Sequence, residues 1–552
     1  MTNQQIADVL SQFGDLLDVK GESGFRVSAY RRAAETVKHL DEPVSTLIEE
    51  NRLLDVKGIG KGIAANLEDI HRLGYLPDLE SLQDEIPATL LTILAIPGVG
   101  PKTAGRLYRE LGITNLEDLE KAVHDGLVST LKGIGAKQET RILEGIAFLR
   151  QRTGRLSIGT ALPLAKELSR AIAESCDVRV EVAGSARRGS ETVGNLDFIA
   201  ETGDLPSVLS AAAAHVGADR LTVETQSESV IEAEISGLCR IRIVCTTPDQ
   251  FGSTLVRLTG SQRHLAELGF DQHPCHSEEE VYERFGLPVI PPELREGTGE
   301  CEAARLGQLP NLVELAGIQG DLHLHSDWSD GRATIPQLAA RARELGYAYL
   351  SIADHSHSLA IANGLDAERL LLQRQEIERT QADLTDLRLI CANEVEIRRD
   401  GSLDFPDEVL ARLDLVVASL HSGRNMSRDE LTERLLTAIE NPHVDIIAHP
   451  TGRIVEQRAP AEYDWDAVFE AAARTGTALE INANPARLDL PEDLARRAVD
   501  TGVLVSIDSD AHDLAGLDLM EYGVKIARRG WVPAERVINT WDVQDLLAWL
   551  DR

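Results

Sequence analysis

The C-terminal part of the chain repeats one pattern seven times, and this repeat constrains the fold more than any other feature of the sequence. A short apolar run ends in a polar, often histidine-containing break, and a stretch with helical periodicity follows. The seven runs are DLHLHS (321–326), YLSIADHS (349–356), LRLICANEVEI (387–397), LDLVVASLHS (413–422), VDIIAHP (444–450), ALEINA (478–483) and VLVSIDSDAH (503–512). Because β-branched runs that alternate with helices indicate buried parallel strands, residues 318–552 are predicted to form a (β/α)7 barrel, one unit short of eight.

Side chains that can bind metal cluster at the ends of these runs, where such barrels place their chemistry. His323 with His325, and Asp510 with His512, are spaced two residues apart, so each pair should point to one side of a strand. One histidine at a strand end is more often a surface or core residue, but so many at one rim favour a shared site. The candidates are His323, His325, Asp330, His355, Glu394, His421, His449, Asp510 and His512. Imidazole mixed with carboxylate favours Mn²⁺, Zn²⁺ or Fe²⁺ over Mg²⁺.

Other polar residues near this rim have weaker cases. Asp321 is placed to orient a metal-binding histidine, and His357 either contacts substrate or is solvated. For Arg453, contact with a substrate phosphate and a solvated loop position are equally expected. For Arg398 and Arg399, a solvated loop position is favoured over a phosphate contact.

Three short turns in the N-terminal third share a Gly-apolar-Gly pattern with a lysine close behind: GIGKG (58–62), PGVGPKTA (97–104) and KGIGAKQ (132–138). Glycine permits the tight turn, and the free N–H groups of the next helix can hold a phosphate oxygen. One such turn often only joins two helices, but three in succession favour helix-hairpin-helix binding of nucleic acid. The expected DNA contacts are Gly58, Gly60, Lys61, Gly98, Gly100, Lys102, Gly133, Gly135 and Lys137.

Composition limits how the chain can hold DNA. The formal net charge of −34 argues against binding through a broad basic surface. Either directed backbone donors and small Arg/Lys clusters make the contacts, or the chain does not bind DNA at all. The six cysteines are scattered without a CxxC motif, which predicts a reducing, cytoplasmic and nucleoid-associated location. No apolar run is long enough to cross a bilayer, so no membrane contact is expected.

These motifs resemble two known families. Residues 1 to about 310 resemble family X DNA polymerases, the remainder resembles the PHP (polymerase and histidinol phosphatase) domain, and IPPELREGTGE (290–300) is typical of their bacterial and archaeal fusion. The resemblance implies a multidomain fold with all-α helix-hairpin-helix domains, an α+β nucleotidyltransferase palm and thumb, and a distorted PHP barrel. The implied boundaries are 1–80 for the lyase-type helical domain, 81–152 for the fingers, 153–250 for the palm, 251–310 for the thumb and linker, and 318–552 for the PHP barrel.

The palm motif GSARRGSETVGNLDFIA (184–200) departs from the family in its metal carboxylates. The family's three aspartates hold two Mg²⁺ ions, but here their positions fall on Asn195, Asp197 and Arg240. An amide offers one neutral oxygen and a guanidinium none, so the resemblance implies only weak Mg²⁺ or Mn²⁺ binding and an eroded polymerase site. The matched nucleotide contacts are Gly184, Ser185, Arg187 and Arg188, with Gly260 and Ser261 of the thumb TGS motif.

Two of the residues that the family expects and this chain lacks, a palm carboxylate and a lyase lysine, have candidate replacements. Glu232 or Glu234, on the preceding strand, is a candidate replacement for the missing palm carboxylate. The family's lyase lysine falls on Asn66, and Lys57 or Lys61 is its nearest substitute.

The nine barrel candidates match the PHP pattern motif by motif, and the family implies a cluster of up to three metals. Glu394 is then the bridging carboxylate, and the catalytic residues are Glu394 and Asp510 in the barrel and Asp197 in the palm. The resemblance therefore implies a monomeric DNA-repair enzyme whose PHP domain is a metal-dependent 3′–5′ exonuclease or phosphodiesterase on gapped DNA or DNA 3′ ends. Three alternatives stay open: a Mn²⁺-dependent gap-filling polymerase that uses dNTPs and has a proofreading PHP domain, a DNA-end-binding scaffold, and a small-molecule phosphoesterase.

Overall fold

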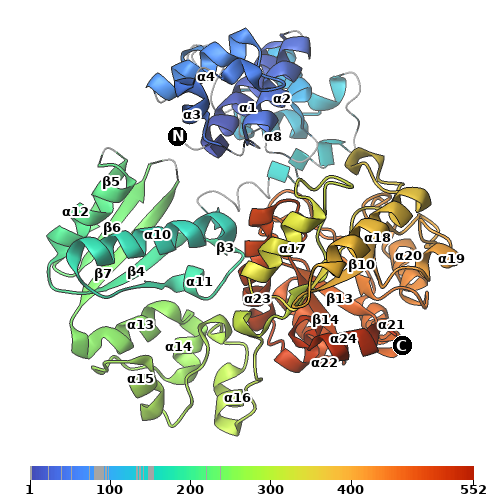
Figure 1. The fold of residues 1–552 in the computed structure, drawn as a ribbon. Coiled ribbons are helices and arrows are strands. Elements are labelled where there is room, and N and C mark those ends of the chain that lie inside the picture. Colours follow the sequence, from blue (N-terminus) through green and yellow to red (C-terminus); the bar gives the residue numbers. More distant parts are fainter. Residues whose placement is uncertain are drawn as a thin grey trace. The chain divides into compact units, whose positions relative to one another are not determined.

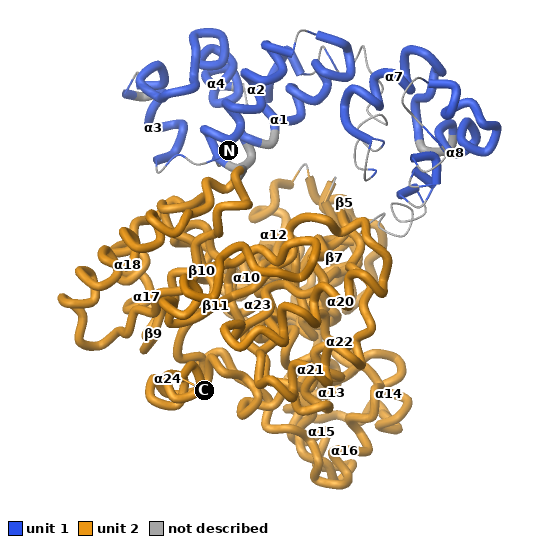
Figure 2. The backbone as a smooth tube through the Cα atoms, turned by 90° about the vertical axis from the view of Figure 1, so that its right-hand side faces the viewer, with its two compact units in different colours: residues 1–153 blue, residues 154–552 orange. Residues whose placement is uncertain are grey.

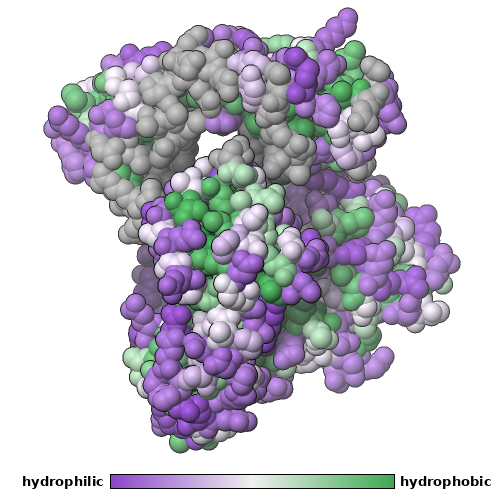
Figure 3. Space-filling model, turned by 90° about the vertical axis from the view of Figure 1, so that its left-hand side faces the viewer, coloured by the Kyte–Doolittle hydropathy of each residue, from purple (hydrophilic) through white to green (hydrophobic). Residues whose placement is uncertain are grey.

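The chain forms two compact units in the computed structural model, residues 1–153 and residues 154–552 (Figures 1 and 2). The structure describes residues 3–551 except 23, 39, 41, 51, 74, 80, 81, 83–92, 94, 95, 97, 98, 132–134, 136, 137, 141, 144, 147–154, 219 and 237. Within that part of the chain, no helix combines the length and apolar character needed to cross a membrane. Hydrophilic side chains predominate on the face drawn in Figure 3, and apolar ones form patches between them.

The described part of the first unit is helical. Its α-helices are α1 (Asn3–Lys20), α2 (Gly24–Lys38), α3 (Val44–Glu49), α4 (Lys61–Leu73), α7 (Pro101–Leu111) and α8 (Leu116–His124). Their apolar faces share one core, in which the rings of Phe13 from α1 and Tyr30 from α2 meet edge to face, 4.7 Å apart.

The second unit begins with a five-stranded sheet. Its order is β2 (Val180–Ala183), β4 (Asn195–Glu201), β7 (Cys239–Thr246), β6 (Val230–Ile235) and β5 (Leu221–Gln226). Alternation along β4 divides its side chains: Leu196 and Phe198 pack with α10 (Ile158–Cys176) and α12 (Leu205–Val216), whereas Ile199 packs with α13 (Phe251–Thr259). Asp197 shares the face of Ile199, so it faces the side of the sheet that α13 covers. The remaining helices of this region are α11 (Gly184–Arg187), α14 (Gln262–Leu268), α15 (Glu278–Arg284) and α16 (Glu300–Leu306).

The rest of this unit is a parallel seven-stranded barrel. Strand order follows the sequence: β8 (Gly320–Asp321), β9 (Tyr349–Ile352), β10 (Arg388–Glu396), β11 (Leu415–Ser419), β12 (Ile446–Ile447), β13 (Ala478–Asn482) and β14 (Val505–Asp508). A parallel bridge from Leu324 to Ala511 joins the first and last segments, so the barrel is nearly closed. The predicted multidomain fold class, with its seven-stranded barrel, is confirmed.

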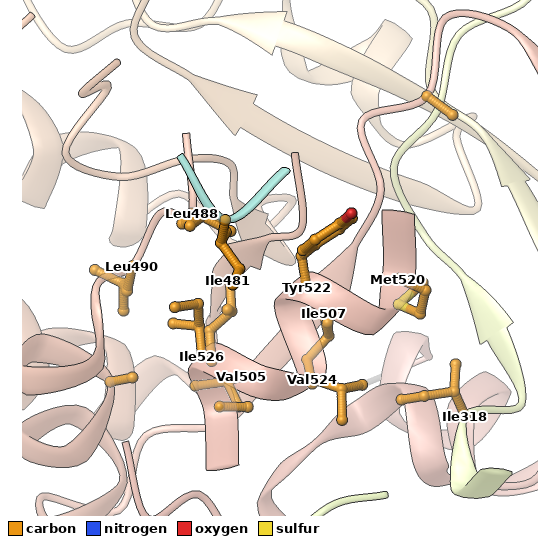
Figure 4. Close-up of a cluster of buried hydrophobic side chains, with 14 of the residues drawn as sticks. Ile318, Ile481, Leu488, Leu490, Val505, Ile507, Met520, Tyr522, Val524 and Ile526 are labelled. Atoms are coloured by element: carbon orange, nitrogen blue, oxygen red, sulfur yellow. The ribbon is translucent and has the colours of Figure 1, made fainter. Parts of the chain in front are cut away.

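Helices cover the outside of this barrel. They are α17 (Ile335–Glu344), α18 (Ala367–Ala382), α19 (Asp407–Leu410), α20 (Arg428–Ile439), α21 (Trp465–Thr475), α22 (Glu492–Asp500), α23 (Met520–Arg529) and α24 (Val543–Leu550). Figure 4 shows one packed layer, in which Val524 and Ile526 of α23 lie against Ile481 of β13 and Ile507 of β14. This buried layer fixes the strands from which the polar site is built.

Candidate metal centre and palm site

The barrel brings all nine predicted metal ligands together at the C-terminal ends of its strands. Glu394 of β10 lies at the centre, fully buried, and its two oxygens approach five imidazoles. The distances are 3.0 Å to His449 Nε2 and 3.4 Å to His421 Nε2 from Oε1, and 2.6 Å to His355 Nδ1, 3.5 Å to His323 Nε2 and 3.7 Å to His325 Nε2 from Oε2. A carboxylate so placed can bridge cations held by different histidines.

Two aspartates complete the cluster. Asp510 Oδ1 lies 3.1 Å from His325 Nε2 and 3.8 Å from His512 Nδ1. Asp330 Oδ1 lies 3.5 Å from both His355 Nε2 and His512 Nε2. Three overlapping groups have donor atoms within 4.8 Å of one another: His325 with Asp330, His355 and His512; His323 with His325 and Asp510; and His355 with Glu394 and His421. Each group is compact enough for one cation.

Several imidazoles are held from behind, which leaves the other ring nitrogen toward the centre. Glu480 Oε1 lies 2.6 Å from His323 Nδ1, and Glu396 Oε2 lies 3.0 Å from His421 Nδ1. A backbone oxygen two residues earlier lies 2.9 Å from His512 Nδ1. Such acceptors fix the tautomer and the ring orientation, as they do behind metal-bound histidines.

Buried atoms without partners support a bound cation. Among the described residues, His323 Nε2, His355 Nδ1 and Glu394 Oε2 are buried and make no aligned hydrogen bond, although they face one another. Unsatisfied buried polar atoms are rare and destabilising, and a divalent cation between them would satisfy all three. The residues present therefore fit a metal cluster.

The electrostatics of the cluster also call for positive charge. Burial alone would raise the pKa of Glu394, but His355 and His421 outweigh it and hold that pKa well below its usual range. Burial alone would lower the pKa of His355, but Glu394 and Asp330 outweigh it and raise it to about 10. Glu394 and Asp330 thus stay ionised and hold a proton on His355. A divalent cation can take the place of such a proton and supply the positive charge that the carboxylates need.

Two other imidazoles are neutral, the form that binds a metal. Burial, with His512 acting in the same direction, lowers the pKa of His325 to about 3. Burial and the charge of Arg487 lower the pKa of His449 to about 3. Neither ring needs to lose a proton before it can coordinate a cation.

The two ligand pairs do not lie on strands, as their spacing predicted, although both members of each pair do reach the same site. Strands β8 and β14 end at Asp321 and Asp508, so the pairs lie in the loops that follow and not on the strands. Asp510 has a φ of +52°, a left-handed conformation that turns the chain back toward the centre. His323 and His325 are both fully buried, with their ring centroids 5.2 Å apart.

Sequence reasoning missed several residues of this site. Glu480 and Asn482, both fully buried in β13, contact His323 and Asp510: the Asn482 amide donates to Asp510 Oδ2 over 3.1 Å. The signal was present, because an acid and an amide inside the apolar run ALEINA must have polar partners. Asp321 does not orient a histidine side chain as predicted, since its carboxylate accepts hydrogen bonds from the Ser509 hydroxyl and from the Ser509 and His323 backbones.

Two of the three arginines with weaker cases, and the histidine, have protein partners. Arg398 Nη2 and His357 Nδ1 both lie 3.2 Å from Asp404 carboxylate oxygens. Arg453 Nη2 lies 2.8 Å from Glu191 in the palm region. Arg453 is therefore engaged in joining the barrel to the palm, while Arg399 is an exposed loop residue.

In the palm, Asp197 is already bound by its neighbours. Arg242 Nε and Asn195 Nδ2 each donate to its Oδ1 over 2.7 Å. The parallel register pairs Asp197 with Arg242 and Asn195 with Arg240, and Arg240 is exposed, 3.3 Å from Glu224. Burial raises the pKa of Asp197, with Arg242 opposing that rise. The guanidinium against the carboxylate is therefore Arg242, a residue that sequence reasoning did not single out.

Neither alternative carboxylate contacts Asp197. Glu232 and Glu234 are exposed on β6, opposite Arg242 and Arg240 in the adjoining strand β7. Glu232 accepts a hydrogen bond from Thr225 over 2.9 Å. Strand β7 separates both side chains from β4.

The predicted nucleotide contacts are placed together but engaged with protein. Gly184 has a φ of +66°, and a Cβ there would lie 2.2 Å from an Asp197 oxygen, so only glycine fits beside this carboxylate. Arg187 Nη2 lies 2.6 Å from Glu278, and Arg188 Nε lies 2.8 Å from Glu296.

The two predicted contacts in the thumb motif have structural roles. Ser261 caps α14 by accepting from the His264 backbone N–H over 3.1 Å. Gly260 lies beside it, where a Cβ would lie 2.8 Å from the His264 ring. Ser185, in the short helix α11, is half-buried.

The described hairpin turns have the expected form. Gly58 has a φ of +105°, Ile59 is buried, and Gly60 leads into α4 with Lys61 exposed. In the second and third turns, Gly100 precedes α7 with Lys102 exposed, and Gly135 precedes a helical segment. Gly98, Gly133 and Lys137 lie outside the described residues. Asn66, at the lyase-lysine position, donates to the Tyr30 hydroxyl over 3.1 Å.

Comparison with known proteins decides the family. The chain is 37% identical, over 583 aligned positions that cover all of both chains, to the DNA polymerase/3′-5′ exonuclease PolX of Bacillus subtilis (strain 168). The chain belongs to the family X DNA polymerases that carry a PHP domain. Models of a helix-hairpin-helix domain match residues 1–76, a SAM-like helix-hairpin-helix tandem matches 50–111 and 88–147, and a PHP domain matches 321–484.

Relatives that share only the PHP part are named as phosphatases. A probable phosphatase of Thermoanaerobacter sp. (strain X514) is 30% identical over 233 residues, 40% of this chain and 89% of that protein. A probable phosphatase of Syntrophotalea carbinolica is 28% identical over 233 residues, 40% of this chain and 90% of that protein. This family X chain therefore combines a barrel similar to free-standing phosphatases with helix-hairpin-helix and palm regions.

Proposed function

We propose that this chain is a DNA-repair enzyme whose PHP barrel hydrolyses phosphodiester bonds at DNA 3′ ends with the help of bound divalent metals. The observation that carries the proposal is the nine-residue cluster, in which five imidazoles approach Glu394 and unpartnered buried atoms face one another. The name of the Bacillus subtilis relative includes 3′-5′ exonuclease, and the PHP relatives are named probable phosphatases, which agrees with the proposal.

The three donor groups would hold up to three ions, with Glu394 shared between them. Their mixture of imidazole and carboxylate favours Mn²⁺, Zn²⁺ or Fe²⁺. Such ions, when bound, lower the pKa of a water molecule and offset the charge of phosphate oxygens. Asp510 is proposed as the second catalytic carboxylate, because it contacts His325 and is itself buried.

The protein's own contribution is to orient these groups. Glu480 holds His323 from behind, and Glu396 holds His421, so that each ring keeps one nitrogen toward the centre. In the overall reaction a water oxygen forms a bond to phosphorus, and the bond from phosphorus to the 3′-oxygen breaks. One proton of the water goes to the 3′-oxygen, and the other stays on the new phosphomonoester or passes to solvent. The products are a 5′-mononucleotide and a DNA strand shortened by one residue.

DNA would be held by the helix-hairpin-helix turns. The first N–H groups of α4 and α7 follow Gly60 and Gly100 and have no partner within their own helices. Phosphate oxygens fit such helix starts without a broadly basic surface, which agrees with the net charge of −34. The assignment of residues 1–80 and 81–152 to DNA-binding domains, 153–250 to a palm, 251–310 to a thumb and 318–552 to the barrel is part of this proposal, as is a monomeric state.

A second candidate function is gap-filling synthesis at the palm, because the name of the Bacillus subtilis relative includes DNA polymerase. The ion pair between Arg242 and Asp197 argues against efficient synthesis. A metal at Asp197 would have to displace a guanidinium that already neutralises this carboxylate. We therefore rank synthesis with dNTPs below hydrolysis of DNA ends, and binding of Mg²⁺ or Mn²⁺ at the palm as weak.

One experiment separates these functions. The protein is incubated with Mn²⁺ and a gapped duplex whose primer carries a 5′ label, with and without dNTPs. Shortening of the primer that disappears in His325→Ala supports the nuclease, and extension that disappears in Asp197→Ala supports the polymerase. Tight binding of the duplex without either product would leave only a DNA-end-binding scaffold and would overturn the proposal.

A further inference from the structure

Three consecutive barrel loops carry arginines close to the proposed metal centre. The loop after β11 carries His421 and Arg424, and the loop after β12 carries His449 and Arg458. The loop after β13 carries Arg487. Because the C-terminal ends of adjacent parallel strands meet at one rim, these cations share the rim with the metal ligands.

Contacts within these loops draw two of the arginines together. Arg424 donates to the carbonyl of Gly452, and Arg458 Nε donates to the same carbonyl over 2.9 Å. Gly452 has a φ of +55°, and a Cβ there would lie 1.8 Å from Arg424 Nη1, so glycine is required for this approach. Arg424 Nη2 also donates to Thr451 and Ala459 carbonyls over 3.0 and 3.2 Å, which leaves it fully engaged.

Arg487 joins this group to the metal centre. Its Nε lies 3.3 Å from Asp510 Oδ2. Burial together with the positive charges of Arg424 and Arg487 lowers the pKa of Arg458 to about 10. Arg424 and Arg458, which share the Gly452 carbonyl, lie close enough to repel each other, and Arg487 adds its charge at the same rim. An anion between these loops would relieve that repulsion.

Apart from the contact of Asp510 with Arg487 Nε, the acid near this group is Asp489, and its carboxylate is engaged elsewhere. Asp489 is buried, and its two oxygens accept hydrogen bonds from the backbone and hydroxyl of Thr451. The Nη groups of Arg458 and Arg487 donate no hydrogen bond to any residue that the structure describes. Arg487 thus keeps free Nη donors beside the proposed catalytic centre, and Arg458 keeps them on the neighbouring loop. Such forked donors match the oxygens of a phosphate group.

We infer that Arg458 and Arg487 bind the internucleotide phosphate that lies next to the phosphodiester being cleaved. The inference rests on the proposed nuclease function and names the feature of the substrate that the site selects. A substrate with one phosphate would use the metal centre alone, whereas a polynucleotide would use both. The barrel would thereby prefer a DNA strand to a phosphomonoester or an isolated diester.

The test compares two dinucleotides that contain the same cleavable phosphodiester and differ only in a 5′-terminal phosphate. In Mn²⁺, wild-type protein is expected to cleave the 5′-phosphorylated form with a kcat/KM about tenfold higher. Arg458→Gln should lose this preference while it keeps the wild-type kcat/KM on the unphosphorylated form. Arg458→Lys, which keeps the charge but not the fork, should retain part of the preference.

Arg412→Gln is the matched control, because Arg412 is an exposed arginine that precedes β11, at the opposite end of the strand. It should keep the full preference. The inference is overturned if Arg458→Gln retains the preference, or if it lowers the rates on both dinucleotides equally. A wild-type protein that cleaves neither dinucleotide nor a longer labelled strand refutes the nuclease itself, whereas normal cleavage without any preference refutes only the phosphate subsite.

Discussion

Replacing Glu480 by glutamine tests whether the acceptor behind His323 governs metal binding. Glu480 Oε1 lies 2.6 Å from His323 Nδ1, and its Oε2 accepts from the Asn482 amide over 3.1 Å and from the His449 backbone N–H. Glutamine has the same shape, but it removes a charge-assisted hydrogen bond. Its NH₂ group must also face either the His323 ring or the N–H groups of Asn482 and His449, which are themselves donors. The loss of such a bond is worth about 1.5–3 kcal/mol, or roughly a 10–100-fold weaker metal affinity.

The assay is a calorimetric titration of metal-free protein with Mn²⁺, followed by the Mn²⁺ dependence of exonuclease activity. Both midpoints should move to higher Mn²⁺ by about 10–100-fold, and activity should recover at saturating metal. The matched control is Glu300→Gln in the thumb region. Glu300 is also fully buried and lies 2.7 Å from a histidine nitrogen, His264 Nδ1, away from the nine-residue cluster.

Glu300→Gln should lower stability without changing Mn²⁺ affinity. If both variants weaken Mn²⁺ binding equally, the effect of Glu480→Gln reflects general destabilisation of the protein. If Glu480→Gln binds Mn²⁺ as the wild type does, His323 does not depend on this acceptor, and the proposed orientation of the ligand is wrong.

Three further outcomes follow from the palm, the thumb region and the cluster. Primer extension should rise when Asn195→Asp is combined with Arg242→Ala, which frees Asp197, but not when it is combined with Arg240→Ala; equal rates would refute the block by Arg242. Burial raises the pKa of Glu278, but its arginine partners outweigh burial and lower it to about 2, below its ordinary value of 4.5. Its stabilisation, up to about 3 kcal/mol, should therefore be present above pH 4.5 and be lost as the pH falls toward 2, so urea unfolding of Glu278→Gln should show a flatter acid branch. Chelation should lower the Tm of the wild type and Mn²⁺ should restore it, whereas Glu394→Gln should respond to neither.

The barrel and its ligands could be predicted because their signals are local. Each ligand follows an apolar run by a few residues, and the C-terminal ends of parallel strands converge on one rim whatever the loops do. The acceptors behind the ligands were not predicted, since Glu480 and Glu396 are recognised only when the rings of His323 and His421 are in place. The phosphate-facing arginines depend on loop conformations, such as that of Gly452, which spacing does not determine.

In the palm, the residue types were identified but their pairing was not. Two arginines alternate on β7, and the one that meets Asp197 is decided by the register of two parallel strands. A shift of that register changes the partner, and strand register is set by long-range packing rather than by local sequence. Arg242 was therefore visible in the sequence only as another positive residue near the expected aspartate.

The two candidate centres differ in how their charges are satisfied. In the palm, Arg187 pairs with Glu278 and Arg188 pairs with Glu296, which Arg529 of the barrel also contacts over 2.7 Å. A triphosphate at these arginines would have to replace protein carboxylates, leaving the displaced acids half-buried and unpaired.

Around Glu394, by contrast, carboxylates and imidazoles face one another with buried atoms left unpartnered, so a cation would take the place of the imidazole protons and would leave no carboxylate unpaired. Binding of a charged ligand is favoured where it completes a set of interactions and opposed where it must break one. This difference, more than the count of aspartates, is the physical reason to expect the chemistry of this chain in the barrel.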